Sequence, residues 1–251
     1  MNFFQLIDST YRIRYKESIL LSRQKKKRKA KLKKKRQLKR KRGKNTPFTI
    51  ANCPKKLKGI QNRYEYKINV HHCNFANATF NDVRYRSGHI TESAFKQAIF
   101  TNIDFITINF KKAKFFNTIF ENVVFFSCNL TDVNFKNAHF KNVHFINCKL
   151  KNLKFFNTTK EIHIISKYQK PTISSYLSYK ILFMKNISKL EKYHILTTTS
   201  GDINYWMLNI LLTNFTEKQI SIFFSKLILN NKQQFFTIND YQRALQKFYQ
   251  I

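Results

Sequence analysis

The chain has 251 residues, with 47 Lys or Arg against 13 Asp or Glu, a formal net charge of +34 and 26 Phe. Four glycines are too few for a glycine-rich phosphate loop, no G-x-S-x-G motif is present and the acidic residues are scattered, so we expect no enzyme. No apolar run reaches the roughly 18 residues of a transmembrane span. Residues 1–22 also lack an uninterrupted signal-peptide stretch. These features predict a cytoplasmic protein, or a nuclear one if the host has a nucleus.

The N-terminal segment, residues 1–44, ends in a polybasic run. Residues 23–44 hold 16 Lys or Arg and no acidic residue, and their few apolar side chains build no helical face. Self-repulsion and the lack of core material predict that this run is disordered. The candidate polyanion-binding residues are Arg23, Lys25, Lys26, Lys27, Arg28, Lys29, Lys31, Lys33, Lys34, Lys35, Arg36, Lys39, Arg40, Lys41, Arg42 and Lys44.

Several partners fit such a run. Cations without base-reading geometry favour nucleic acid, bound with strong salt dependence and no sequence preference. The same run could act as a nuclear address, or attach to an anionic membrane at about 1 kcal/mol per Lys or Arg near the surface. It could also be a solvated tail. These alternatives stay open.

Residues 45–72, with Pro47 and Pro54, are interpreted as an N-terminal cap that leads the chain onto the region that follows. At its end stands His71-His72-Cys73, three side chains that could hold a metal. A zinc site needs about four ligands, usually supplied as two spaced pairs. Because no second pair stands at a recognisable spacing, the sequence predicts no metal and no cofactor.

Between residues 73 and 157 a large apolar residue recurs at every fifth position. This period of five fits neither a helix face, with its period of 3.6, nor a strand face, with its period of 2. It therefore indicates an internal repeat. The 17 positions, 13 of them Phe, are Phe75, Phe80, Tyr85, Ile90, Phe95, Phe100, Phe105, Phe110, Phe115, Phe120, Phe125, Leu130, Phe135, Phe140, Phe145, Leu150 and Phe155.

Two other positions of the five-residue unit keep step with the large one. The residue two places before it is small or apolar in nearly every unit and never charged. The residue two places after it is Asn in nine of 17 units. Asn tolerates positive φ and close turns, so the unit predicts two inward side chains followed by a turn.

This unit resembles the pentapeptide-repeat family over residues 73–157. Asn replaces the family's Gly at the turn, and the family's Asp or Asn before the large residue survives in places such as Asn74 and Asp104. The resemblance implies a mainly β fold, a right-handed β-helix of square cross-section with four units per coil and about four coils. Positions 20 apart should then stack, and the aliphatic exceptions Ile90, Leu130 and Leu150 do share one column.

The square coil sorts the remaining side chains onto its faces. The outward positions of the third face form a possible apolar contact strip, made of Ile106, Phe126 and Ile146. Such a strip marks a contact, either with the C-terminal helices of the same chain or with a partner protein or second copy. The fourth face carries a possible basic surface, made of Lys111, Lys112, Lys149 and Lys151.

Two cysteines also fall one full coil apart, in the small inner column. The coil places Cys128 and Cys148 within the Cα range of a disulfide. A reducing compartment favours two buried thiols instead, and the sequence analysis predicts those.

Residues 158–251 lose the five-residue period and show helical patterns. Thr216 and Gln219 have the spacing of a capping box ahead of an apolar face, which predicts a helix from Thr216. Further helices are predicted from near Thr237, over 205–212, and within 172–198.

Two functions of different class follow. The first is a non-catalytic protein that binds nucleic acid or another polyanion through its polybasic run. The second, implied by the resemblance, is a protein-binding scaffold like those relatives that bind DNA gyrase by mimicking duplex DNA. Mimicry needs an acidic rod, whereas residues 71–157 hold 11 basic and five acidic residues. The charge therefore favours the first function, with attachment to an anionic membrane as a further alternative.

Overall fold

The computed structural model describes residues 24, 26–31, 49–58, 64–167, 170–187, 189–230 and 232–250. The chain divides into two units, Met1–Pro47 and Phe48–Ile251. In the first unit, residues 24 and 26–31 are helical with exposed side chains. Lys, Arg and Ala are strong helix formers, which accounts for the helix over these few residues. The rest of the polybasic run lies outside the described residues.

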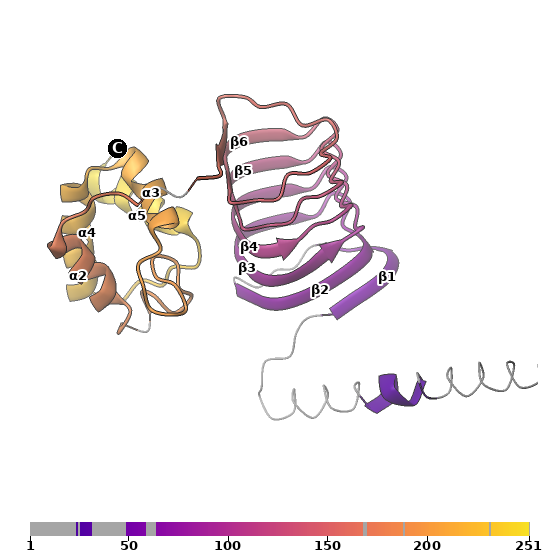
Figure 1. The fold of residues 1–251 in the computed structure, drawn as a ribbon, viewed down its shortest axis with the longest axis horizontal. Coiled ribbons are helices and arrows are strands. Elements are labelled where there is room, and N and C mark those ends of the chain that lie inside the picture. Colours follow the sequence, from indigo (N-terminus) through magenta and orange to yellow (C-terminus); the bar gives the residue numbers. More distant parts are fainter. Residues whose placement is uncertain are drawn as a thin grey trace, which may run out of the picture. The chain divides into compact units, whose positions relative to one another are not determined.

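The second unit begins with a parallel β-solenoid (Figure 1). Its strands pair in chain order within one sheet, and partners such as Phe100 and Phe120 stand one coil period apart in the sequence. The first two strands cover most of the predicted cap, so the coil begins well before Cys73 and makes six strand-to-strand turns instead of about four. The strands are β1 (Thr49–Lys56), β2 (Tyr64–Asn74), β3 (Thr79–Thr91), β4 (Ile99–Asn109), β5 (Ile119–Phe126), β6 (His139–Ile146) and β7 (Ile162–Ile165).

The corners of the solenoid recur at every fifth residue. From Lys67 to Asn152 each fifth residue has positive φ, between 49° and 61°. This confirms that the turn falls two residues after the large one, where Asn is frequent because it tolerates the left-handed region. Corner side chains also form ladders: the Nδ2 of Asn142 donates to Oδ1 of Asn122 at 2.8 Å, and that of Asn122 to Oδ1 of Asn102 at 3.3 Å.

Phenylalanine rings fill the interior of the coil. Along a column the rings stack face to face, as Phe105 and Phe125 do with centroids 5.2 Å apart and planes 22° apart. Between columns they meet edge to face, as Phe105 and Phe110 do at 5.0 Å and 90°. Both arrangements suit the ring quadrupole. The cavity between Val70 and Phe110 measures only about 10 Å³, which leaves no room in these turns for a ligand larger than water.

The repeat begins before the Phe columns do. Ile68 and Val70 are buried in the same core. Further upstream the period is interrupted: Glu65 pairs with Tyr85 and so stands at a large position. The register also shifts between Cys53 and Lys56, so that Leu57 packs against the core. The close approach of the Ile68 backbone also explains why residue 88 is a glycine. A Cβ on Gly88, whose φ is +139°, would lie 2.1 Å from the carbonyl oxygen of Ile68 in the neighbouring turn.

The prediction that Phe155 is the last inward-facing residue of the repeat is wrong. Phe155 has φ 55° and its side chain is 65% exposed. Phe156 packs inward instead, 5.5 Å from Phe135 and 5.4 Å from Phe145 between ring centroids. The register shifts after this slip, so that Val143 pairs with Ile162 and not with His163.

Four helices follow the solenoid in the described part of the chain: α2 (Ser175–Met184), α3 (Tyr205–Asn214), α4 (Glu217–Leu229) and α5 (Ile238–Tyr249). The predicted capping box of Thr216 and Gln219 is confirmed, and Thr237 with Asp240 forms a second. The helix predicted within 172–198 covers only its first part, as α2. In the loop that follows, the carboxylate of Glu191 accepts from the main-chain N–H of Leu196 and Thr197. Among the described residues, none of the helices is both long and apolar enough to cross a membrane.

Helices α2 and α4 pack around a buried ammonium group. Lys180, which is 5% exposed, donates to the carbonyl and hydroxyl oxygens of Ser221 at 2.8 and 3.1 Å. Its Nζ also lies 3.6 Å from the ring centroid of Tyr176. These partners offset the desolvation of the charge.

Candidate functional site

The predicted apolar strip lies at the junction between the solenoid and the helices. Ile106 and Ile146 are buried in the same hydrophobic cluster as the helical core, and Phe126 packs against that cluster. The ring of Phe126 meets Trp206 of α3 edge to face, with centroids 6.2 Å apart. Of the two occupants considered for the strip, the C-terminal helices of the same chain cover it.

A buried ion pair stands beside this strip. Arg84 of β3 and Asp104 of β4 are 2% and 1% exposed, and Nη1 lies 2.5 Å from Oδ2. Asp104 also accepts the N–H of Ile238 in the first turn of α5 at 3.0 Å. Burial raises the pKa of Asp104 to about 6, while the Arg84 charge opposes that rise. The pair therefore joins two turns of the coil to the start of a helix.

Corner residues of the solenoid provide the other polar contacts of α5. The Nδ2 of Asn239 donates to Oδ1 of Asn102 at 2.7 Å. Arg243 bridges Asp82 at 2.6 Å and Asp240 at 2.5 Å. Sequence reasoning found Asp82 and Asn102 as turn residues but missed this docking role, since their partners lie near the C-terminus, outside the repeat.

A cleft of about 590 Å³ opens beside the junction, lined by residues of both the solenoid and the helical region. Arg86 and Trp206 are among its lining residues, with Asp202 as an acidic neighbour. His194 also lines it, and its pKa is lowered by burial and then by the charges of Arg86 and Arg84. Because Arg84 is paired with Asp104 and Asp202 also lines the cleft, the charges around it are of both signs.

The predicted basic surfaces are exposed wherever the structure describes them. Lys26, Lys27, Arg28, Lys29 and Lys31 lie on the helix of the first unit. The other basic residues of 23–44 lie outside the described residues. On the fourth face, the predicted lysines are exposed on the turns that carry Asn109, Asn129 and Lys149 in one column, and they are Lys111, Lys112, Lys149 and Lys151.

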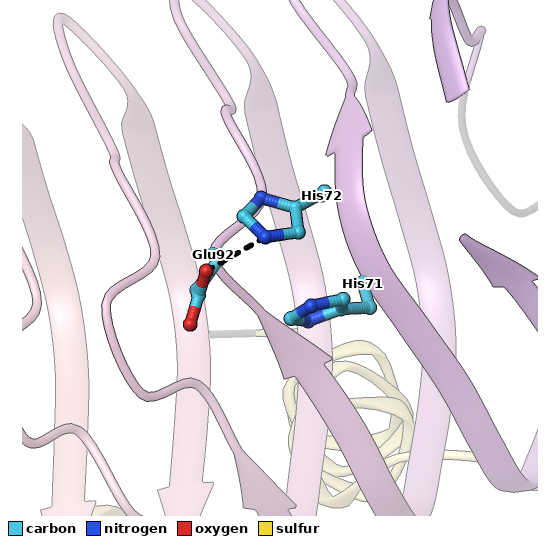
Figure 2. Close-up of side chains that lie close together, drawn as sticks. All are labelled: His71, His72 and Glu92. Carbon is cyan, nitrogen blue, oxygen red and sulfur yellow. Dashed lines mark ion pairs between the residues drawn. The ribbon is translucent and has the colours of Figure 1, made fainter. Parts of the chain in front are cut away.

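The His71-His72-Cys73 triplet divides between the surface and the core. Cys73 is 3% exposed and belongs to the inner core. His71 and His72 lie outside, and the third nearby ligand is Glu92, from the following turn (Figure 2). Sequence reasoning missed Glu92, which stands one period of the coil after His72.

The two inner cysteines stack as predicted. Sγ of Cys128 lies 3.2 Å from the Phe105 carbonyl oxygen, and Sγ of Cys148 lies 3.1 Å from that of Phe125. The four cysteines of the chain are free thiols. Burial raises the pKa of Cys128 well above its usual value, so this thiol is poorly suited to act as a nucleophile.

Glu191 is a buried carboxylate with structural partners. It is 2% exposed and accepts from the Leu196 N–H, from the N–H and hydroxyl of Thr197, and from the hydroxyl of Tyr241. Burial raises its pKa. These hydrogen bonds hold the loop before α3 against α5. This structural role explains why the Glu191 carboxylate is buried, and no catalytic role is needed to explain it.

A quadrilateral parallel solenoid with a turn at every fifth residue defines the class of this fold. Residues 128–158 match the sequence model of the family described as "Pentapeptide repeats (8 copies)". The solenoid therefore has the pentapeptide-repeat pattern and fold, and its last turns are the part that matches the family model. None of the curated proteins compared with the chain matches it significantly.

Solved structures of pentapeptide-repeat proteins are among those similar to the chain. Rfr23 from the cyanobacterium Cyanothece 51142 is 12% identical, with a TM-score of 0.31, and the match covers 45% of this chain and 85% of that one. A protein from the Arabidopsis thaliana thylakoid lumen is 10% identical, with a TM-score of 0.20 and coverage of 65% and 98%. QnrB1, described as a plasmid-mediated fluoroquinolone resistance protein, is 10% identical, with a TM-score of 0.20 and coverage of 57% and 98%.

Proposed function

We propose that the protein is a non-catalytic binding protein that associates with nucleic acid or another polyanion through residues 23–44. The observation that carries this proposal is the density of charge in that segment, which holds 16 Lys or Arg and no acidic residue. Such a segment neutralises phosphates and releases their counterions. The solenoid then serves as a rigid body to which the basic segment is attached.

The exposed lysines of the fourth face support a second, weaker contact with the same partner. The two pairs stand two turns apart, roughly 10 Å at about 4.8 Å per turn, and the turn between them carries Asn129 and Thr131. This spacing suits phosphate groups but offers no fixed geometry for base edges. We therefore expect affinity without sequence preference.

Binding of a labelled DNA duplex, an RNA of equal length and anionic lipid vesicles is measured over a salt series. If about half of the 16 cations contact phosphates, log K for DNA should fall with log salt at a slope of about −7. Replacing all 16 by Gln should remove most of the affinity and flatten the slope.

The matched control replaces Lys111, Lys112, Lys149 and Lys151 by Gln. This variant should keep most of the affinity. If the variant without the 16 cations binds as tightly as the original chain, the proposal is wrong. If the chain binds the vesicles but neither DNA nor RNA, its partner is an anionic membrane and not nucleic acid.

A protein partner or self-association is the second candidate, and one observation favours it. The outer side of α2 exposes three aromatic side chains one turn apart, Tyr176, Tyr179 and Phe183, which are 61%, 63% and 39% exposed. Exposed aromatic patches of this kind mark contacts. Sedimentation of the chain and of its Tyr179→Ser variant tests self-association. A monomer at every concentration used would reject that form of the candidate.

A further inference from the structure

One corner of the second turn brings two neighbouring imidazoles onto the same side. Successive side chains of a straight strand point to opposite faces. His72 instead has φ 49° and turns the corner. The rings of His71 and His72 consequently lie 4.1 Å apart between centroids, at an angle of 64°.

The next turn of the coil supplies an oxygen ligand at the same corner. His71 pairs with Thr91 in the β2–β3 register, so Glu92 stands beside His72. Oε2 of Glu92 lies 2.8 Å from Nε2 of His72 (Figure 2). One ring nitrogen from each histidine and one carboxylate oxygen all lie within 4.8 Å of one another.

Thr91 holds the remaining ring in place. Its Oγ1 lies 2.7 Å from Nδ1 of His71, an outer contact of the kind that orients metal-bound histidines. The side chains of His72 and Glu92 are 49% and 33% exposed. Solvent therefore reaches the three ligands, and a water molecule has room to complete a coordination sphere.

The charges around the corner decide which cation suits it. Glu92 donates its N–H to the carbonyl oxygen of Lys111, so Lys111 and Lys112 occupy the next corner. A hard cation such as Mg²⁺ or Ca²⁺ needs six or more oxygen ligands, and a single carboxylate beside two lysines is unsuited to it. Two imidazoles and a carboxylate suit Zn²⁺.

We propose that His71, His72 and Glu92 bind one Zn²⁺ ion, with water as the fourth ligand. The ion links the second turn of the coil to the third, near the N-terminal end of the solenoid. Zinc binding therefore stabilises that end against local opening, in proportion to the free zinc concentration.

The test uses the full chain without a histidine tag, stripped of metal with a chelator. Zinc affinity is measured by competition with a chromophoric chelator, and the ligand field by the visible absorption of bound Co²⁺. We expect one equivalent of Zn²⁺ and a rise in unfolding temperature. His72→Ala and Glu92→Gln should each weaken binding by about tenfold or more and abolish the temperature shift.

Two histidine variants serve as matched controls. His139→Ala removes an exposed histidine of the same solenoid, and His163→Ala disrupts the pair in which His144 and His163 stack at 4.6 Å. Both should bind zinc as the original chain does. The proposal fails if no zinc binds, if His72→Ala and Glu92→Gln bind normally, or if His163→Ala is the variant that loses the ion.

Discussion

The solenoid and the C-terminal helices bury their aromatic residues in opposite ways. In the solenoid, Phe100 stacks between two identical rings, Phe80 at 4.5 Å and Phe120 at 5.2 Å. In the helical region, Tyr241 stacks on Phe235 at 4.1 Å and donates its hydroxyl to the carbonyl oxygen of Leu190. One environment repeats at every turn, whereas the other occurs once.

This difference teaches where mutations should be costly. A residue at a repeated position contacts equivalent residues in the turns above and below, and these contacts follow from the sequence spacing. A unique position depends on partners far away in the chain. The largest effects are expected where the two regions meet, and smaller effects where each region acts alone.

The ion pair at the junction should give the largest effect. Asp104→Asn leaves Arg84 charged and buried without its partner, which should lower the free energy of unfolding by about 3–5 kcal/mol. The double variant Arg84→Met/Asp104→Asn removes both charges and keeps an acceptor for the Ile238 N–H, so it should recover most of that loss. Urea unfolding at pH 7 measures both. A double variant as unstable as the single one would contradict this account.

His144 on β6 should make stability depend on pH. Burial, and then the neighbouring His163, lower its pKa in the folded chain to about 4, below the unfolded value of about 6.5. Below pH 6.5 the unfolded chain binds a proton at His144 that the folded chain does not. The free energy of unfolding is therefore highest above pH 6.5 and falls by about 3 kcal/mol as the pH drops towards 4.

His144→Gln should remove this dependence, so the variant loses less stability than the original chain between pH 7 and pH 4.5. Asp104 acts in the opposite direction, because its folded pKa of about 6 lies above the ordinary value. That contribution is common to both proteins and cancels in their difference. Equal pH profiles from urea unfolding would show that His144 is not buried as described.

The slip at the end of the Phe columns can be tested with two adjacent residues. Phe156→Ala should cost about 2 kcal/mol, since the half-buried ring packs on three others. Phe155→Ala should change stability by less than about 0.5 kcal/mol, because its side chain is largely exposed. Thermal unfolding compares them, and the reverse order would restore an unbroken five-residue period.

Helix caps and solenoid corners should show the smallest effects. Thr216→Ala removes the cap of α4 and should cost about 1 kcal/mol. Asn117→Ala places a Cβ-bearing residue without a polar side chain at φ 50° and should cost about as much. Glycine should be tolerated at both positions, so glycine variants that unfold more easily than the alanine ones would contradict both explanations.

The solenoid core could be predicted from sequence because its physics is periodic. A ring at Phe105 requires one at Phe125, and the corner between them requires a residue that accepts positive φ. The first turns were missed because Glu65 takes the place of Phe in one of them, and a register shift between Cys53 and Lys56 breaks the period in the other. The exchange of Phe155 for Phe156 could not be found, since Phe155 keeps the five-residue period and Phe156, an equally large ring beside it, breaks it.

The contacts between regions could be predicted only in part. The strip at Ile106, Phe126 and Ile146 is visible because three outward apolar residues share one face. Nothing in the spacing links Asp104 to Ile238, because no period connects the two regions. Glu92 was within reach of sequence reasoning, as the coil period places it beside His72.

The period of the coil also sets how such a gene can lengthen. A duplication that encodes one whole turn would insert it in register with the turns on either side. Inserted after Ile146, that turn would leave the contacts of α5 with Asp82 and Asn102 untouched. Inserted between Asp82 and Asn102, it would separate two residues that both form hydrogen bonds with α5. Descendants of this protein should therefore differ in length outside that interval and keep it constant within.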